Sequence, residues 1–160
     1  MTSPSPGLNA ASIQDKLGSH CQRTGVFDTV NRYEVKNAPG RGVHAEVFLD
    51  TIDPIQTSGL NASSVRIGWK IRISTDMLAE PQDDIDPRIA DAADIVFSSL
   101  HQDFQLNDDT VDDVRFIDLL GAHGAALGAK AGYINRDNKQ YRVIDVTVPV
   151  IINDAWSQNP

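Results

Sequence analysis

Residues 64–74 constrain the fold of this chain more than any other segment. Apolar residues fill every second position, and polar residues or glycine lie between them. The apolar positions are Val65, Ile67, Trp69, Ile71 and Ile73. Because successive side chains of a β-strand point to opposite faces, this period of two predicts a strand with one face on a core. The other face is expected to meet water or a partner.

Two other segments show helical spacing. In the first, apolar residues recur four positions apart, at Ile13, Leu17 and Cys21. With Asn9 as N-cap and Gly25 as stop, they predict a helix over about residues 10–24. In the second, Asp86-Pro87 supplies an N-cap followed by proline at the first helical position, and an apolar stripe follows. This pattern predicts a helix over about residues 87–101.

Further strands are expected around these elements. Residues 43–50 alternate and are expected to end at Asp53-Pro54, which opens a polar connection over residues 53–63. Residues 111–120 are also predicted as a strand, although their alternation is imperfect. Residues 121–132 are rich in glycine and alanine and are expected to form a mobile loop.

The C-terminal part of the chain predicts a β-hairpin. Its arms are residues 131–136 and 140–152, with Asp137-Asn138 in the turn. Pro149 has no N–H to donate, so we expect it on an edge strand or at a strand end. Residues 153–160 are expected to be a polar tail.

Together these elements predict an α+β fold, with a mostly antiparallel sheet and two main helices packed on one face. The order is helix, strands, helix, strands, and hairpin connections dominate. A length of 160 residues fits one core. We therefore expect a single domain over residues 9–160, preceded by a flexible N-terminal arm over residues 1–8 that is rich in serine, proline and glycine.

Charge and composition exclude several classes of protein. Lysine and arginine number 14 against 22 acidic residues, which leaves a formal net charge of −8. Such a chain repels phosphate, so dedicated DNA binding is disfavoured. The single cysteine, Cys21, excludes an intrachain disulfide. No signal peptide is expected at the N-terminus, and no apolar run approaches the roughly 18 residues that a membrane span needs. We expect a soluble protein.

The glycine-rich stretch and the aspartate runs are candidate sites for ligands. Around Lys130 the stretch lacks the Gly-Lys-Ser/Thr sequence of a phosphate-binding loop, so a loop that orders on a partner is the preferred interpretation. The aspartates are Asp83, Asp84, Asp86, Asp108, Asp109, Asp112 and Asp113. They lack the spacing of a calcium loop and are typical of solvated turns. No metal and no cofactor is predicted.

No catalytic residue is predicted either. The neighbours His20 and Cys21 point apart on a helix, and Cys21 lies on its apolar face, where a core role is favoured over a nucleophile. The chain also lacks the Gly-x-Ser-x-Gly sequence of serine hydrolases. We therefore predict that the protein is not an enzyme.

A basic strand face is the feature that points to assembly. Arg66, Lys70 and Arg72 share the polar face of the predicted strand at residues 64–74. In a ring, unlike faces of identical subunits meet, so acidic segments of a neighbouring copy would complement these cations. A solvated sheet face is the alternative. The candidate assembly residues are Arg66, Lys70, Arg72, Asp83, Asp84, His123 and Lys130.

Six segments resemble the tail terminator family of long-tailed bacteriophages, particularly those of actinobacterial hosts. They are KNAPG (36–40), MLAEPQDDIDP (77–87), DLLGAHG (118–124), AGY (131–133), YRV (141–143) and VPVIINDAW (148–156). The resemblance runs from about residue 10 to the end of the chain and is carried by the number and order of these segments.

The resemblance implies a structural virion protein. Similar proteins form a hexameric ring that docks on the last ring of tail tube protein, stops tube growth and presents a surface to head completion and neck proteins. DNA passes through the ring without specific binding. The resemblance implies no cofactor, no membrane and no catalysis, and places the protein at the tail–neck junction after assembly in the host cytoplasm. A head–tail joining protein is one alternative, and a small enzyme or ligand-binding protein that uses the glycine-rich loop is another.

Overall fold

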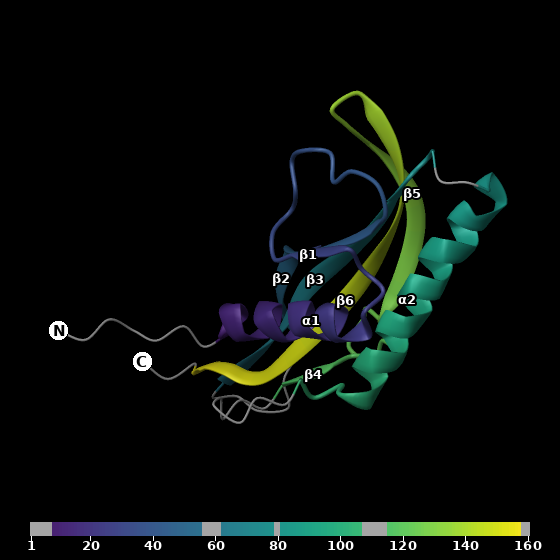
Figure 1. Ribbon diagram of the computed structural model, residues 1–160. Coiled ribbons are helices and arrows are strands. Elements are labelled where there is room, and N and C mark those ends of the chain that lie inside the picture. Colours follow the sequence, from purple (N-terminus) through teal and green to yellow (C-terminus); the bar gives the residue numbers. More distant parts are fainter. Residues whose placement is uncertain (1–7, 56–61, 79–80, 107–114, 158–160) are drawn as a thin grey trace.

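The computed structural model describes residues 8–55, 62–78, 81–106 and 115–157 (Figure 1). Two helices are present in this part, α1 (Ala10–Thr24) and α2 (Ile85–Gln102), and a 3₁₀ turn, η1 (Gln82–Asp84), directly precedes α2. The strands are β1 (Thr29–Asn31), β2 (Val43–Ile55), β3 (Ala62–Asp76), β4 (Arg115–Ile117), β5 (Gly128–Arg136) and β6 (Lys139–Ser157).

All six strands form one twisted sheet. Their order is β1-β2-β3-β6, and the outer edge of β6 pairs with β5 near one end and with β4 near the other. The sheet is mixed, and the expectation of a mostly antiparallel sheet is corrected, because β1 runs parallel to β2. The connection over residues 32–42 causes this, since it returns the chain to the end of the sheet at which β1 began (Figure 1).

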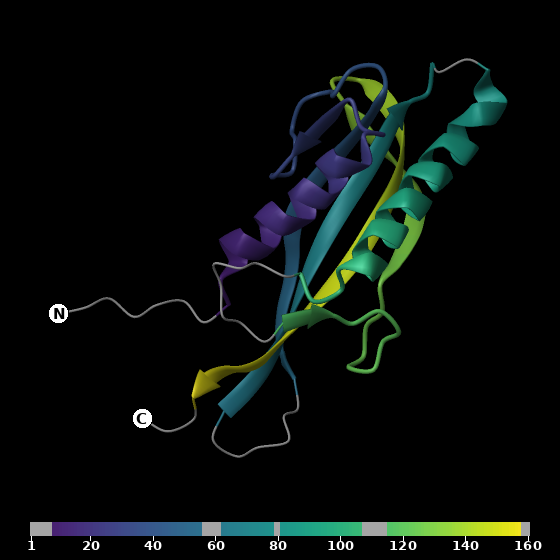
Figure 2. The same ribbon diagram turned by 60° about the horizontal axis from the view of Figure 1, so that its bottom comes forward.

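Both helices cover the same face of the sheet (Figure 2). The five alternating apolar residues of β3, from Val65 to Ile73, are at most 3% exposed and pack against this helical layer. Ile13, Leu17 and Cys21 of α1 are fully buried in the same core. The predicted α1, its stop at Gly25 and the predicted central strand are therefore confirmed.

The helix starts differ from the expected caps. Asn9 precedes α1 with a left-handed backbone, φ 48° and ψ 50°, and its side chain does not cap the helix, since capping requires an extended backbone. The second helix begins at Ile85, two residues before the predicted start, because η1 leads directly into it. Asp86 therefore lies inside the first turn, where its carboxylate accepts a bond from Arg142 Nε at 2.9 Å.

Two strands run further than the sequence indicates. β2 continues through Asp53-Pro54 to Ile55. Beyond Glu46 no described strand pairs with its outer side, and proline is tolerated on such an edge. β6 continues to Ser157, so the expected polar tail is wrong over residues 153–157. The cause is the start of β3, whose Ser63 pairs with Trp156.

The region between α2 and β6 was predicted less well. Only Arg115–Ile117 of the strand predicted over residues 111–120 is a strand in the described part, and residues 107–114 lie outside that part. Strand β5 begins at Gly128, so the expected loop over residues 121–132 is wrong in its second part. Of the expected N-terminal arm, only Leu8 is described, and it packs half-buried against the core.

The β5–β6 hairpin confirms the turn predicted at Asp137-Asn138. Both turn residues have positive φ, 52° and 61°, as a type I′ turn requires. Pro149 lies inside β6 opposite Gly68, against the expectation of an edge or strand end. Its carbonyl accepts the N–H of Asp118 at 2.9 Å, so its imino nitrogen faces the same side, in the gap between β5 and β4. No ladder bond is lost there.

Candidate assembly surface

The face of the sheet that points away from the helices carries the predicted basic residues. Cross-strand pairing arranges its side chains in rows. One row is Glu46, Arg72, Asp145 and Lys130, and the next is Phe48, Lys70, Thr147 and Gly128. Side chains that are neighbours in such a row interact directly. The fold therefore brings Lys130 onto the same face as Lys70 and Arg72, with β6 between them, although they are far apart in the sequence.

One end of this face is closed by the segment over residues 32–42. Glu46 is 1% exposed, accepts the N–H of Val35 at 3.1 Å and pairs with Arg136 Nη1 at 3.1 Å. Glu34 lies 3.4 Å from Arg72 and 4.0 Å from Arg136, so it joins both guanidinium groups. Burial raises the pKa of Glu46, and the charge of Arg136 opposes that rise. This is a buried ionic network and not a free surface.

Arg72, a predicted assembly residue, is part of the same network. Its guanidinium donates two bonds to Asp145, at 2.9 Å and 3.3 Å, and lies 5.2 Å from the centre of the Phe48 ring. Burial alone would lower the pKa of Arg72, but the hydrogen bonds and charge of Asp145 outweigh it and the pKa is raised. Most of the charge on Arg72 is therefore neutralised within the subunit.

The other end of the face is closed by a loop that Asp118 organises. The carboxylate of Asp118, which is 4% exposed, accepts the N–H groups of Gly121, Ala122 and His123 at 3.1, 2.9 and 2.8 Å. Arg66 donates to the carbonyl of His123 at 2.7 Å and pairs with Asp53 at 3.5 Å. The protein's own carboxylate thus occupies the N–H groups that a phosphate would need, which argues against the ligand-binding alternative.

His123 and Arg66 therefore help to stabilise this loop. The His123 ring lies 5.9 Å from the Phe116 ring, tilted by 54°, and its side chain remains exposed. Asp118 was not predicted as a site residue, although glycines follow it at positions 121 and 124, and both have positive φ. An aspartate shortly before such a turn was the available signal.

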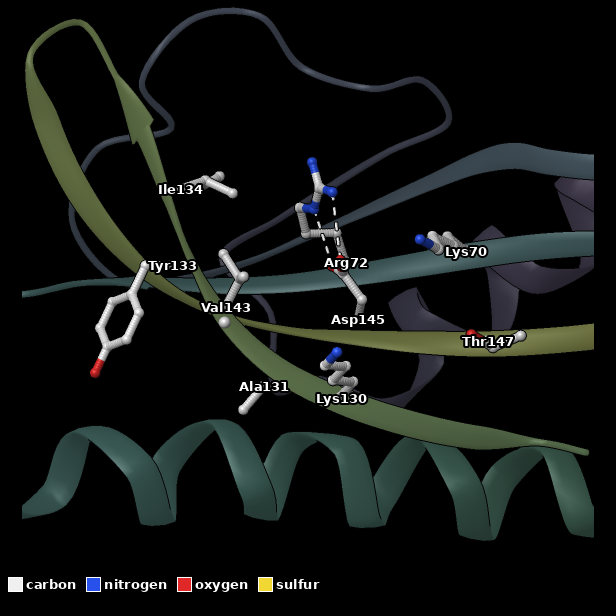
Figure 3. A pocket seen from close by; sticks show the side chains of 10 residues that line it. Lys70, Arg72, Lys130, Ala131, Tyr133, Ile134, Val143, Asp145 and Thr147 are labelled. Carbon is white, nitrogen blue, oxygen red and sulfur yellow. Dashed lines mark hydrogen bonds and ion pairs between the residues drawn. The ribbon is translucent and has the colours of Figure 1, made fainter.

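Between the two closed ends lies an open cavity, which we call the lysine groove. Its volume is about 350 Å³, and Lys70, Arg72, Lys130, Asp145 and Thr147 contribute to its lining (Figure 3). Lys130 is exposed and Lys70 is half-buried. Within the described residues no carboxylate lies within pairing distance of either lysine. Among the basic residues predicted for assembly, these two lysines therefore remain available to a partner.

Asp83 and Asp84 lie elsewhere. Both are exposed in η1, at the start of α2, and so belong to the helical layer. The outer side of α2 extends this acidic surface, because Asp91 and Asp94 are also exposed. The structure therefore separates the predicted acidic and basic residues onto two different surfaces.

A polar cluster that the sequence analysis missed joins the two helices. His20 is 4% exposed; its Nδ1 lies 2.7 Å from Ser99 Oγ and its Nε2 lies 2.9 Å from Asp103 Oδ2. A carboxylate only accepts, so Nε2 carries the hydrogen and Nδ1 accepts from the Ser99 hydroxyl. The cluster borders an open cavity of about 360 Å³ lined also by Arg23 and Gln102.

The order hydroxyl, imidazole, carboxylate is that of a nucleophilic triad, but the helix that carries the hydroxyl does not supply the oxyanion donors of such a triad. Such a triad acts with N–H donors aimed at the oxyanion of the intermediate. Ser99 lies in the last turn of α2, where backbone N–H groups are used within the helix. We therefore interpret the cluster as a polar link between α1 and α2. Burial raises the pKa of the adjacent Cys21 thiol to about 12, which favours the protonated thiol over the nucleophilic thiolate.

The His20 link predicts a pH-dependent contribution to stability. Burial, and less strongly the charges of Arg23 and Lys16, lower the pKa of His20 from 6.5, while Asp103 opposes the shift. The folded state therefore binds this proton less readily than the unfolded state. This contribution to the free energy of unfolding is present above pH 6.5. It is lost as the pH falls from 6.5 through the lowered pKa that His20 has in the folded state.

We expect a His20→Gln variant to lack this loss. The measurement is the free energy of unfolding by urea for both proteins between about pH 5 and 8, taken as wild type minus variant, because shared titrations cancel in that difference. The difference should shrink as the solution becomes more acidic. A difference that stays constant over the range would contradict the lowered pKa.

Metal-binding clusters and membrane-spanning helices are both absent from the part of the chain that the structure describes. In that part of the chain no three histidine, cysteine, aspartate or glutamate side chains gather as metal ligands would. The second aspartate group, residues 108–113, lies outside it. Neither described helix has the length and apolar character to cross a bilayer.

Comparison with known proteins shows a likeness to solved structures only at low sequence identity. No family model matches the sequence, and no curated protein matches it. Among solved structures, the chain is similar to the PVC sheath/tube terminator of an extracellular contractile injection system in its extended state, seen by cryo-EM. The identity is 12% and the TM-score 0.41, over 99% of this chain and 60% of that one. The chain thus spans less than two thirds of that structure, and a likeness of this size carries no argument about function.

Proposed function

We propose that this protein is a tail terminator of a long-tailed bacteriophage, a structural virion subunit and not an enzyme. In this proposal it forms a hexameric ring on the last ring of tail tube protein, stops tube growth and presents a surface to head completion and neck proteins. It acts at the tail–neck junction after assembly in the host cytoplasm, and DNA passes through the ring without specific binding.

The separation of unpaired charge onto two surfaces is the observation that carries this proposal. Lys70 and Lys130 lie on the sheet face, and aspartates cover the outer side of α2. Unlike surfaces on one subunit suit a heterologous contact, which is the contact that builds a ring. The net charge of −8 also suits a hole through which DNA slides. The six segments that resemble tail terminators support a position of this ring at the end of a tail tube.

The direct test is tube capping. The purified protein would be mixed with the tail tube protein of the same phage under polymerising conditions, and tube lengths would be measured by electron microscopy. We expect tubes that shorten as the ratio of this protein to tube protein rises, with a ring at one end. Unchanged lengths would refute the proposal, and binding to head components instead would support a head–tail joining protein.

A further inference from the structure

We infer that α2 of one copy, together with the 3₁₀ turn η1 that leads into it, docks exposed aspartates in the lysine groove of the next copy. The inference rests on the proposed ring and names the two surfaces that meet in it. The acidic surface consists of Asp84, Asp91 and Asp94, which we call the aspartate stripe. The occupant of the groove is thus a second copy of this chain, recognised by opposite charge.

The groove offers two cations that the subunit does not neutralise. Arg72 and Arg66 on the same face already have partners within the subunit. Arg72 pairs with Asp145, and Arg66 contacts Asp53 and the carbonyl of His123. Lys70 and Lys130 have no carboxylate at pairing distance in the described part of the chain. They flank the neutralised pair of Arg72 and Asp145, so the groove presents a net positive charge (Figure 3).

The stripe is equally without partners. Asp84, Asp91 and Asp94 are exposed, and none forms an ion pair with another described residue. They are seven and three positions apart, so they lie on one side of the helix. Asp86 is different, because its carboxylate pairs with Arg142 at 2.9 Å within the subunit. The part of α2 that remains for a partner is therefore the stripe.

The two surfaces match in spacing. Lys70 and Lys130 lie on two strands that are separated by β6, and they are offset by one row. Because neighbouring strands are about 4.8 Å apart, the Cα atoms of the two lysines are about 12 Å apart. Asp84 and Asp91 are two helical turns apart, about 10.5 Å along the axis. Each lysine can therefore reach a different aspartate of one docked helix, and the long lysine side chains absorb the difference.

The location of the surfaces sets the type of assembly. The groove lies on the sheet face that points away from the helices, and the stripe lies on the outer side of the helical layer. A two-fold dimer needs both surfaces in one interface, which this arrangement does not allow. The contact is therefore head-to-tail, and it either closes into a ring or extends into a filament.

The test is a charge exchange read out as oligomeric mass. One variant carries Lys70→Glu and Lys130→Glu, and the other carries Asp84→Lys, Asp91→Lys and Asp94→Lys. Each makes both surfaces alike in sign, so we expect self-association at low salt to weaken at least about tenfold in analytical ultracentrifugation. Mixing the variants pairs each altered surface with its opposite again, so the mixture should recover the wild-type mass.

A matched control carries Lys36→Glu and Lys139→Glu, two exposed lysines outside the groove, with the same change in net charge. It should associate like the wild type. Circular dichroism and urea unfolding would establish that all variants are folded. The inference is overturned if the groove variant keeps the wild-type mass, if the mixture fails to recover it, or if the wild type is monomeric at low salt.

Tube capping separates this inference from the proposed function. A groove variant with wild-type mass that no longer caps tubes would assign the groove to the tube protein, overturning the contact between copies while the terminator role stands. A wild type that associates through the groove, with rescue in the mixture, but never caps tubes would sustain the contact and refute the terminator role.

Discussion

A Leu17→Ala variant is expected to unfold with a free energy about 3 kcal/mol below that of the wild type, within a range of about 2 to 5 kcal/mol. Leu17 is fully buried in α1 and packs in the core formed by both helices and the sheet. Removal of its side chain loses apolar burial and leaves a cavity that the packed layers only partly close. The measurement is urea unfolding followed by circular dichroism at neutral pH.

Leu120→Ala is the matched control. Leu120 is 91% exposed in the loop after Asp118, so the same truncation removes almost no buried surface there. We expect a change below about 0.5 kcal/mol. Equal effects of the two substitutions would show that Leu17 is not buried as the fold requires.

An Arg136→Ala variant is expected to lose about 3 kcal/mol at pH of about 8, because it leaves the carboxylate of Glu46 without its ion pair. Glu46 is 1% exposed, and Arg136 Nη1 lies 3.1 Å from Oε1 of Glu46. Loss of the arginine raises the pKa of Glu46 further, since the positive charge held it down against burial. Glu46 then takes up a proton more readily when folded.

The sign of the pH dependence follows from that raised pKa. A group with a folded pKa above the unfolded value of 4.5 contributes stability at low pH and loses it as pH rises through the folded pKa. The deficit of Arg136→Ala relative to the wild type should therefore be smaller at pH of about 5 than at about 8. Arg41→Ala, at an exposed arginine, is the control and should change stability little at either pH. A deficit that does not depend on pH would contradict the buried network.

Local patterns were sufficient for several elements. The spacing of Leu17 and its neighbours, with Gly25 at φ 72°, located α1 because both signals act within a few residues. The period of two in β3 identified its buried face. Asp137-Asn138 predicted the position of the hairpin turn, because the turn requires positive φ and few residue types adopt it readily. In each case the physical cause lies inside the segment.

The assembly surface shows where local patterns stop. Lys70 and Arg72 look equivalent in the sequence, since both point to the polar face of one strand. Asp145, which is 73 residues from Arg72, neutralises only Arg72. Periodicity reports which way a side chain points and not what lies opposite it, so the pattern overstated the free charge of this face.

Residues within a few positions of one another thus determined where helices, the central strand and the hairpin turn lie, because dihedral preferences and burial periodicity are local. Only the packed chain decided that β1 is parallel, that Pro149 lies inside a strand, and which charges are left over. Those outcomes depend on contacts such as Glu46 with Arg136 or His20 with Asp103, which are 90 and 83 residues apart. These contacts form only once the sheet and the two helices have packed together.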